Sequence, residues 1–282
     1  MNEELSARIR QIVEARVVYE IPGMETVDVR RDIPYKTVED RVLEMDVYRP
    51  AGLADGERRP GVVFVHGGPL PPGGRFPEGI RTPKNWGTFV SYGELAAASG
   101  FVGVAFNHRY TGLDALDASV GDLEAAIGYV REHASELHLD PDRLALWVFS
   151  GAGPHLSLPL RERPAYVRCL VSFYPLLDFA PFAALGLGTA PPEIVEKYSP
   201  RALLEDGGIP PIFLARAGRD DPATNQSLSE FLAAALEHGV TVDFLNHPGG
   251  IHGFDIMNDD ARSREIVARA FEFLAVHLDR DR

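Results

Sequence analysis

A serine, an acidic pair and a histidine follow three strand-like runs of this sequence, in that order along the chain. Ser150 comes directly after LALWVF, Asp220-Asp221 follows IFLARAGR, and His252 lies in the glycine-rich segment HPGGIHGFD. A serine hydroxyl needs an adjacent base to act as a nucleophile, and a carboxylate that accepts the second N–H of that base orients it. The pattern predicts nucleophilic acyl transfer, with Ser150 as nucleophile, His252 as base and Asp220 orienting the base.

Each of these residues also has an ordinary structural interpretation. Ser150 could cap a strand in a glycine loop, and His252 could be a surface histidine in a turn. An aspartate before Pro222 is well suited to cap a helix, so we expect Asp221 to be that cap and Asp220 to be the acid. Adjacent aspartates are hard to tell apart from sequence, and the alternative that Asp221 is the acid stays open. The combination favours catalysis. If the three residues had only structural roles, their occurrence at three strand ends in the order serine, aspartate, histidine would be a coincidence.

Backbone donors for a developing oxyanion are expected at two glycine turns. The amide of Gly151, directly after the nucleophile, is the main candidate, because such amides point at the oxyanion of a tetrahedral intermediate. The turn VHGGPLPPGG follows the strand-like run GVVFV and offers Gly68 as the second donor, with Gly67 as the alternative. Pro69 has no N–H and cannot donate.

The residues beside Ser150 depart from the pattern that is usual for a nucleophile on a tight strand-to-helix turn. That pattern has small residues two positions before and two positions after the serine, and here these positions are Val148 and Ala152. Alanine is a mild change, whereas valine is expected to weaken the motif.

The surrounding chain alternates between strand-like and helical patterns. A stretch at Thr26–Arg30 and the alternating run Val42–Tyr48 predict a strand and a half-buried antiparallel strand. Unbroken apolar runs then predict strands buried on both faces of a parallel sheet, with amphipathic helices between them. The buried runs are Gly61–His66, Phe101–Phe106, Leu144–Phe149, Val167–Phe173 and Ile209–Ala215, and the helices are Phe89–Ala98, Asp117–His133, Leu228–His238 and Ala261–Leu278.

The predicted domain organisation is simple. Helical spacing of apolar residues over Glu3–Tyr19 predicts an N-terminal helical extension, residues 1–24, ahead of a single domain, residues 25–282. The Pro-rich, irregular stretch 178–206 is the best candidate for a small cap or lid. The fold class is α/β, with a mostly parallel central sheet, helices on both faces and an extra N-terminal helix.

Composition excludes several classes of protein. No apolar run approaches the ~20 residues that cross a bilayer, and the N-terminus lacks a secretory signal, so we expect a soluble protein. The single cysteine, Cys169, excludes an internal disulfide and fits a reducing cytoplasm. The net charge of −13 argues against nucleic acid or an anionic membrane as partner. The nine histidines show no HxxxH or HxH spacing with carboxylates that would indicate zinc.

Over roughly residues 25 to 280 the sequence resembles the α/β-hydrolases of the esterase and dienelactone-hydrolase-like groups. The segments that carry the resemblance are LEMDVYRP, VVFVHGG, FSGAGPHLS, RAGRDDP and GGIHGFD. The resemblance implies a triad of Ser150, Asp220 and His252, oxyanion donors at Gly151 and Gly68, a small-molecule substrate, and no metal or organic cofactor. Dienelactone hydrolases proper use a cysteine nucleophile, whereas Cys169 lies inside a buried strand.

Three functions are therefore compatible with the sequence. The first is hydrolysis of a carboxylic ester through an acyl-enzyme, by a carboxylesterase. The second is hydrolysis of another carbonyl bond by the same triad, in a lactone, an amide or a carbon–carbon bond. The third is a non-catalytic binding protein of the same fold, which the altered elbow would suit. The N-terminal helix is expected to cover the pocket or to form the interface of a possible homodimer.

Overall fold

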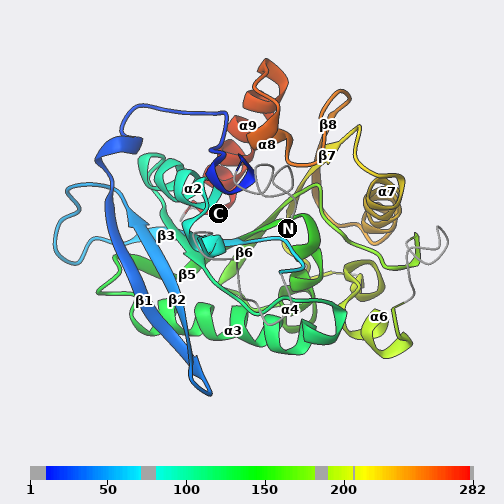
Figure 1. The fold of residues 1–282 in the computed structure, drawn as a ribbon, viewed down its shortest axis with the longest axis horizontal. Helices are drawn as coiled ribbons and strands as arrows, with labels where there is room; N and C mark the ends of the chain where they lie inside the picture. Colours follow the sequence, from blue (N-terminus) through cyan, green and yellow to red (C-terminus); the bar gives the residue numbers. More distant parts are fainter. Residues whose placement is uncertain (1–10, 71–80, 182–189, 206, 280–282) are drawn as a thin grey trace.

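The computed structural model describes residues 11–70, 81–181, 190–205 and 207–279. Its centre is an eight-stranded sheet with the strand order β1-β2-β4-β3-β5-β6-β7-β8. Figure 1 shows helices on both faces of this sheet. β2 is antiparallel to both of its neighbours, and the other neighbouring strands are parallel. The predicted fold class, a mostly parallel sheet covered by helices on both faces, is confirmed.

The elements keep the order that the sequence predicts. The strands are β1 (Asp28–Val38), β2 (Arg41–Arg49), β3 (Arg59–Val65), β4 (Val102–Phe106), β5 (Leu139–Phe149), β6 (Val167–Phe173), β7 (Ile212–Ala217) and β8 (Val242–His247). The helices are α2 (Gly87–Ala98), α3 (Leu116–Glu132), α4 (Ser157–Glu162), α6 (Pro192–Tyr198), α7 (Pro222–Glu237), α8 (Phe254–Met257) and α9 (Ala261–His277).

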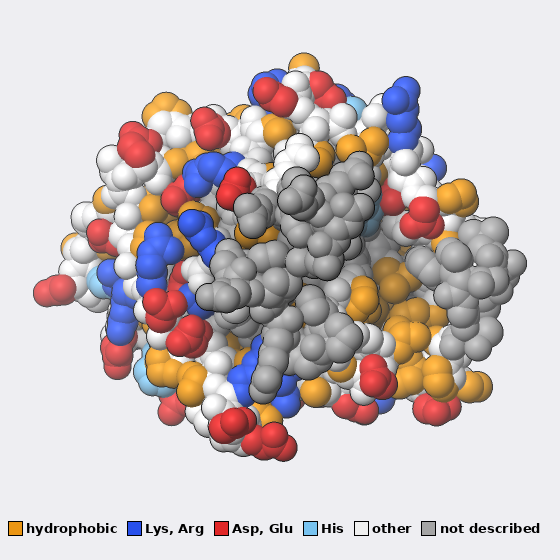
Figure 2. All heavy atoms as spheres, viewed as in Figure 1, with side chains coloured by type: hydrophobic (Ala, Val, Ile, Leu, Met, Phe, Trp, Pro, Cys, Tyr) orange, Lys and Arg blue, Asp and Glu red, His pale blue; other side chains and the backbone are white. Residues whose placement is uncertain are grey.

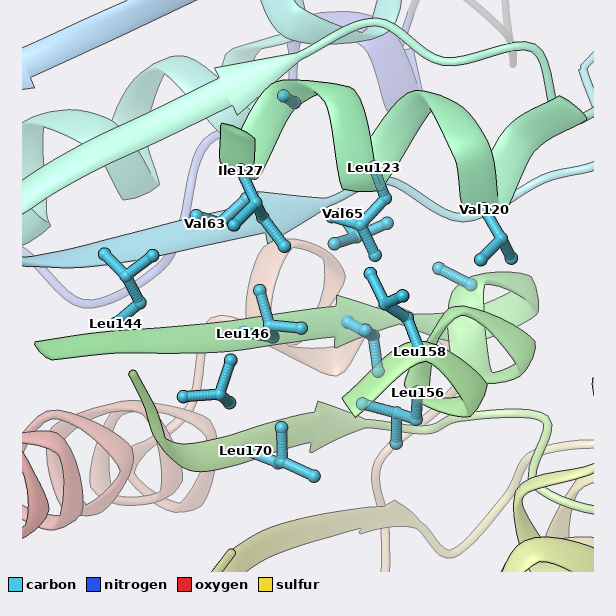
Figure 3. Close-up of a cluster of buried hydrophobic side chains, with 14 of the residues drawn as sticks. Val63, Val65, Val120, Leu123, Ile127, Leu144, Leu146, Leu156, Leu158 and Leu170 are labelled. Atoms are coloured by element: carbon cyan, nitrogen blue, oxygen red, sulfur yellow. The ribbon is translucent and has the colours of Figure 1, made fainter. Parts of the chain in front are cut away.

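Side chains that alternate along the central strand β5 divide the core into two halves. Leu146 and Val148 pack with residues of α3 and α7 in one cluster, part of which is drawn in Figure 3. Trp147 and Phe149 pack with α2 and α9 in the other cluster. Because successive strand residues point to opposite faces, a continuous apolar run is what a sheet covered on both sides requires.

Several strands differ from their predicted bounds, and β5, for example, begins at Leu139 rather than at Leu144. Proline lies at two further differences. β1 runs well beyond the predicted stretch Thr26–Arg30 and includes Pro34, which an edge strand tolerates because one side of its backbone needs no ladder partner. β7 begins at Ile212 rather than at the start of the predicted run Ile209–Ala215. Pro211, directly before β7, has no N–H to donate to a neighbouring strand.

The polar face predicted for the strand Val42–Tyr48 is exposed only in part. Asp46 is completely buried and lies 2.8 Å from the Nζ atom of Lys84, which is also buried. Asp32 binds the same ammonium. Burial opposes the charge of Lys84, but its hydrogen bonds to Asp32 and Asp46 raise the pKa of the ammonium above its usual value. The alternation of buried and exposed side chains along this strand fails at Asp46 because a buried cation, Lys84, pairs with the buried carboxylate. A pairing with another segment is not encoded in the local sequence pattern.

Two predicted segments lie partly outside the described residues. Residues 1–10 of the N-terminal extension are outside them, and residues 11–14 are helical. Beyond this turn, the backbone N–H of Val17 donates to Ser91 of α2, which fastens the segment to the domain. In the stretch 178–206, residues 182–189 and 206 lie outside the described residues, and the remainder contains α6.

Candidate active site

Ser150 directly follows β5 and is the first residue of a short 3-10 segment, Ser150–Leu156, so the chain turns sharply at the serine. Its φ is +55°, a left-handed conformation that is uncommon for a residue with a side chain. The backbone N–H of Leu176 donates to the carbonyl oxygen of Ser150 at 3.0 Å and holds the turn. Such a conformation costs of order 1–3 kcal/mol and persists where the surroundings enforce it, which is typical of functional sites.

Three side chains from distant parts of the chain form one continuous hydrogen-bonded row. Nε2 of His252 lies 2.7 Å from Oγ of Ser150, and Nδ1 of His252 lies 2.6 Å from Oδ2 of Asp220. A carboxylate only accepts, so Nδ1 carries the proton of the neutral imidazole, and Nε2 accepts the serine hydroxyl. The side chain of Asp220 is 4% exposed, whereas that of His252 is 45% exposed. The row therefore runs from a buried carboxylate to an accessible hydroxyl.

The two adjacent aspartates make different contacts. Asp221 caps α7 by accepting the backbone N–H groups of Ala223 and Thr224 and the Thr224 hydroxyl. Burial alone would raise the pKa of Asp221, but the bonds from Thr224 outweigh it and the pKa is lowered. The second oxygen of Asp220 accepts the backbone N–H of Asp221 at 2.8 Å. The structure thus brings Asp220, and not Asp221, against His252.

The Val148 side chain is accommodated in the hydrophobic core. It is completely buried in the cluster with α3, and it lies between Val65 of β3 and Ser172 of β6 in the sheet register. Ala152 is equally buried. The core therefore accommodates both side chains, including the valine that was expected to weaken the motif.

The close approaches at the turn occur at Gly151 and Gly153, the glycines on either side of Ala152. A Cβ on Gly151 would lie 2.4 Å from the carbonyl oxygen of Gly68, and a Cβ on Gly153 would lie 1.7 Å from that of Leu176. Real Cβ atoms do not approach oxygen this closely. On the side after the serine, small residues are therefore required at the first and third positions.

The glycine turn after β3 lies against the serine turn. A Cβ on Gly67 would come within 2.9 Å of the Cβ of Ser150, and the backbone of Gly68 passes next to Gly151. The backbone N–H of Leu70 donates to the carbonyl oxygen of Tyr110 at 2.7 Å, which fixes the far end of the turn. The structure thus brings together the two segments that carry the predicted oxyanion donors, Gly151 and Gly68.

A buried row of histidines connects these two turns. His108 contacts the carbonyl oxygen of His66 through Nε2 at 3.1 Å, and its Nδ1 lies 2.8 Å from the Ser119 hydroxyl. The same hydroxyl lies 2.6 Å from Nε2 of His155, whose Nδ1 contacts the carbonyl oxygen of Ala152. Burial lowers the pKa of His66 to about 3 and that of His155 to about 4. The His108 and His155 imidazoles are neutral near pH 7, so each donates to its carbonyl oxygen, and the single proton of the Ser119 hydroxyl bonds one of the two facing ring nitrogens at a time.

A pocket of about 450 Å³ opens at the serine and the histidine. Its walls are mainly apolar and come from the N-terminal segment, α2, and the loops after β3, β5, β6 and β8. The described residues that line it include no Asp, Glu, Lys or Arg. Aromatic and aliphatic side chains dominate, among them Trp86, Phe89, Phe149, Tyr174, Ile251 and Met257.

Two residues at the site were missed from the sequence. Tyr174, directly after β6, packs its ring on the imidazole of His252, and its hydroxyl donates to the buried carboxylate of Asp255. Available signals were the position of Tyr174 at a strand end, where site residues gather, and an acid three residues after the candidate base. Neither residue type suggests catalysis by itself.

The described ranges contain neither a metal-binding cluster nor a membrane-spanning helix. Their histidine, cysteine and acidic side chains form no group of three or more that could hold a metal ion. None of the helices in the same ranges is both long and apolar enough to cross a membrane.

Acidic and basic side chains are interspersed over the face drawn in Figure 2.

Comparison with known proteins finds esterases. The family model BD-FAE matches residues 45–160, which is less than half of the chain. Esterase LipQ of Mycobacterium tuberculosis is 24% identical over 273 residues, covering 87% of this chain. This chain spans 62% of the length of LipQ.

Solved structures share the fold at low sequence identity. The native esterase Est2 of Thermogutta terrifontis superimposes with a TM-score of 0.69 at 21% identity, covering 90% of this chain and 94% of that one. The same esterase phosphorylated by paraoxon gives a TM-score of 0.67 at 22% identity, covering 91% of this chain and 95% of that one. At this level of identity the likeness establishes the fold.

Proposed function

We propose that this chain, an α/β-hydrolase by its fold and by its similarity to known esterases, is a serine-dependent hydrolase of carboxylic esters. Ser150 attacks the acyl carbon while His252 takes the hydroxyl proton through Nε2. Asp220 holds the imidazole in the tautomer that can accept this proton and stabilises the imidazolium that results. The histidine then gives the proton to the leaving alcohol, and water releases the acyl group by the same steps in reverse order.

The oxyanion of each tetrahedral intermediate would rest on the backbone amides of Gly151 and Gly68. Donors that are already fixed in place stabilise this charge without reorganising during the reaction. The buried histidine row supports this assignment, because it ties the turn that carries Gly68 to the turn that carries Gly151.

One observation carries the proposal: the unbroken row from Ser150 through His252 to Asp220 at the mouth of an apolar pocket. A serine or histidine with a purely structural role needs no such row. The short Ser150–His252 contact therefore argues against a non-catalytic binding protein. That the relatives are named as esterases supports the same conclusion.

The substrate is proposed to be a small, uncharged ester with an apolar acyl or alcohol group. A carboxylate-bearing substrate would have to give up its hydration in a pocket whose described lining supplies no cation to replace it. A volume of about 450 Å³ is in the range of small-molecule sites. The predicted cytoplasmic location and possible homodimer remain predictions.

The test combines turnover with covalent labelling. The purified chain should hydrolyse short-chain p-nitrophenyl esters, and a fluorescent organophosphonate should label it with one equivalent per chain. Ser150→Ala should abolish both. A panel that adds lactones, amides and vinylogous 1,5-diketones separates ester hydrolysis from cleavage of other carbonyl bonds. Wild-type behaviour of Ser150→Ala in both assays would refute the proposed mechanism.

A further inference from the structure

The candidate base is not enclosed by its two hydrogen-bond partners. The His252 side chain is 45% exposed, and the loop that carries it turns sharply at Gly253, whose φ is +76°. An imidazole held only at its two nitrogens can still tilt about the line that joins them. A contact against the face of the ring is needed to limit that motion.

Tyr174 provides such a contact. The centroid of its ring lies 4.7 Å from that of the His252 imidazole, with an angle of 56° between the planes. Tyr174 itself is 4% exposed and packs against Phe149, Phe173 and Phe254. The His252 imidazole therefore packs against the Tyr174 ring, which also contacts buried phenylalanines of the core.

The position of this ring is enforced at both ends. The backbone of Tyr174 has a φ of +39°, which is rare for an aromatic residue, and its N–H donates to the carbonyl oxygen of Ala215 at 2.7 Å. Its hydroxyl donates to Oδ1 of Asp255 at 2.6 Å. A strained backbone that is fastened at the amide and at the tip of the side chain is what a positional role requires.

Asp255 is a completely buried carboxylate that two tyrosines share. Oδ1 accepts the hydroxyl of Tyr174, and Oδ2 accepts the hydroxyl of Tyr92 from α2 at 2.7 Å. Burial raises the pKa of Asp255, although the bonds from the two tyrosines act against it. The backbone oxygen of Asp255 also accepts the N–H of Val18. The anchor therefore joins α2, the end of β6, the N-terminal segment and the histidine loop.

We propose that Tyr174, anchored by Asp255, is a positioning residue for His252. The inference rests on the proposed function, because it concerns the same base. The Tyr174 ring keeps the imidazole in the orientation in which Nε2 faces the Ser150 hydroxyl and Nδ1 faces Asp220. The Asp255 carboxylate acts on His252 indirectly, because it binds the hydroxyl of the Tyr174 ring.

Misplacing a base affects the chemical step more than substrate binding, because the bond that it makes to the moving proton tightens in the transition state. A positional role therefore predicts a fall in kcat with little change in KM. Loss of general stability also lowers the apparent kcat at unchanged KM, because it reduces the folded fraction of the enzyme, so the experiment needs a control variant of matched stability.

Tyr174→Phe and Tyr92→Phe form a matched pair for the experiment. Each variant keeps an aromatic ring and removes one hydroxyl from Asp255, but only Tyr174 touches His252. For Tyr174→Phe we expect kcat on p-nitrophenyl butyrate to fall about tenfold with KM within about twofold of wild type. The rate of organophosphonate labelling should fall by the same factor. For Tyr92→Phe we expect both rates to change less than about twofold, although the melting temperature falls by a similar amount in the two variants.

Proton NMR gives a readout that does not depend on turnover. The proton between Nδ1 of His252 and Asp220 should give a far-downfield resonance in the wild type, broadened or shifted in Tyr174→Phe and unchanged in Tyr92→Phe. Equal kcat losses in the two variants, or a loss expressed only in KM, would overturn the positional role. A wild-type chain that neither hydrolyses esters nor takes the label would instead refute the proposed function. In that case an unchanged downfield resonance in Tyr174→Phe would refute the positional role as well.

Discussion

Oδ2 of Asp220 lies 2.6 Å from Nδ1 of His252, while the carboxylate of the next residue along the chain, Asp221, turns back to cap α7. Two identical side chains on neighbouring residues thus have separate tasks, one toward the candidate base and one toward a helix. The contacts lead to opposite expectations for the two substitutions.

Replacing Asp220 should remove activity with little loss of stability. Asp220→Asn presents an amide that can donate to Nδ1, which favours the wrong tautomer, so we expect kcat to fall about 10³–10⁴-fold. Asp221→Ala should leave kcat within about threefold and lower the free energy of unfolding by about 1 kcal/mol, the usual cost of losing a helix cap. Ester turnover and chemical denaturation of the two variants check this. The reverse assignment would be correct if Asp221→Ala were the inactive variant.

Gly151→Ala should damage the oxyanion site. The new Cβ would lie 2.4 Å from the carbonyl oxygen of Gly68, so the two turns must move apart and the donors with them. We expect kcat to fall about 10²–10³-fold, as when an oxyanion donor is lost. Gly121→Ala is the control, because a Cβ at that position in α3 has no neighbour within 4 Å. It should raise stability by about 0.5–1 kcal/mol and leave kcat unchanged.

Restoring the usual small residue before the nucleophile should not improve the protein. Val148 is fully buried in the core, so Val148→Gly leaves a cavity and loosens a central strand. We expect a loss of about 2–4 kcal/mol in the free energy of unfolding and no rise in kcat. Val42→Gly removes the same side chain from a half-exposed position in β2 and should cost less than half as much. A higher kcat in Val148→Gly would show that the valine obstructs the turn.

The buried histidines predict a fall in stability toward acid. The pKa values of His66, at about 3, and of His155, at about 4, lie below the ~6.5 of an unfolded chain, and burial lowers that of His108 as well. Below pH ~6.5 the unfolded state binds more protons than the folded state, so stability decreases as the pH falls toward 4. Each histidine contributes up to about 1.4 kcal/mol per pH unit.

His155→Gln tests this dependence. The variant should be less stable at pH 7, because it loses buried contacts, but its free energy of unfolding should fall less steeply between pH 6 and pH 4.5. Urea denaturation at a series of pH values measures both slopes. Parallel slopes for the variant and the wild type would contradict the assigned pKa of His155.

The sequence by itself determined the sheet, the order of its elements and the candidate residues at the strand ends. These features follow from local regularities: unbroken apolar runs for strands buried on both faces, helical spacing between them, and glycine-rich turns where strands end. Ser150, His252 and the acidic pair could be found because each lies at such an end. The helix cap at Asp221 was predictable for the same reason, since a cap acts only over the next three residues.

Only the tertiary structure decided how distant side chains meet. The path of a loop decides which aspartate faces His252. The space between β5 and α3 decides whether a valine side chain fits at position 148. The contact of Tyr174 with Asp255 joins residues 81 positions apart, and the burial of Asp46 requires Lys84 from another segment. Contacts of this kind are set by the packing of the whole chain, because no periodicity along the sequence specifies where two separate segments will touch.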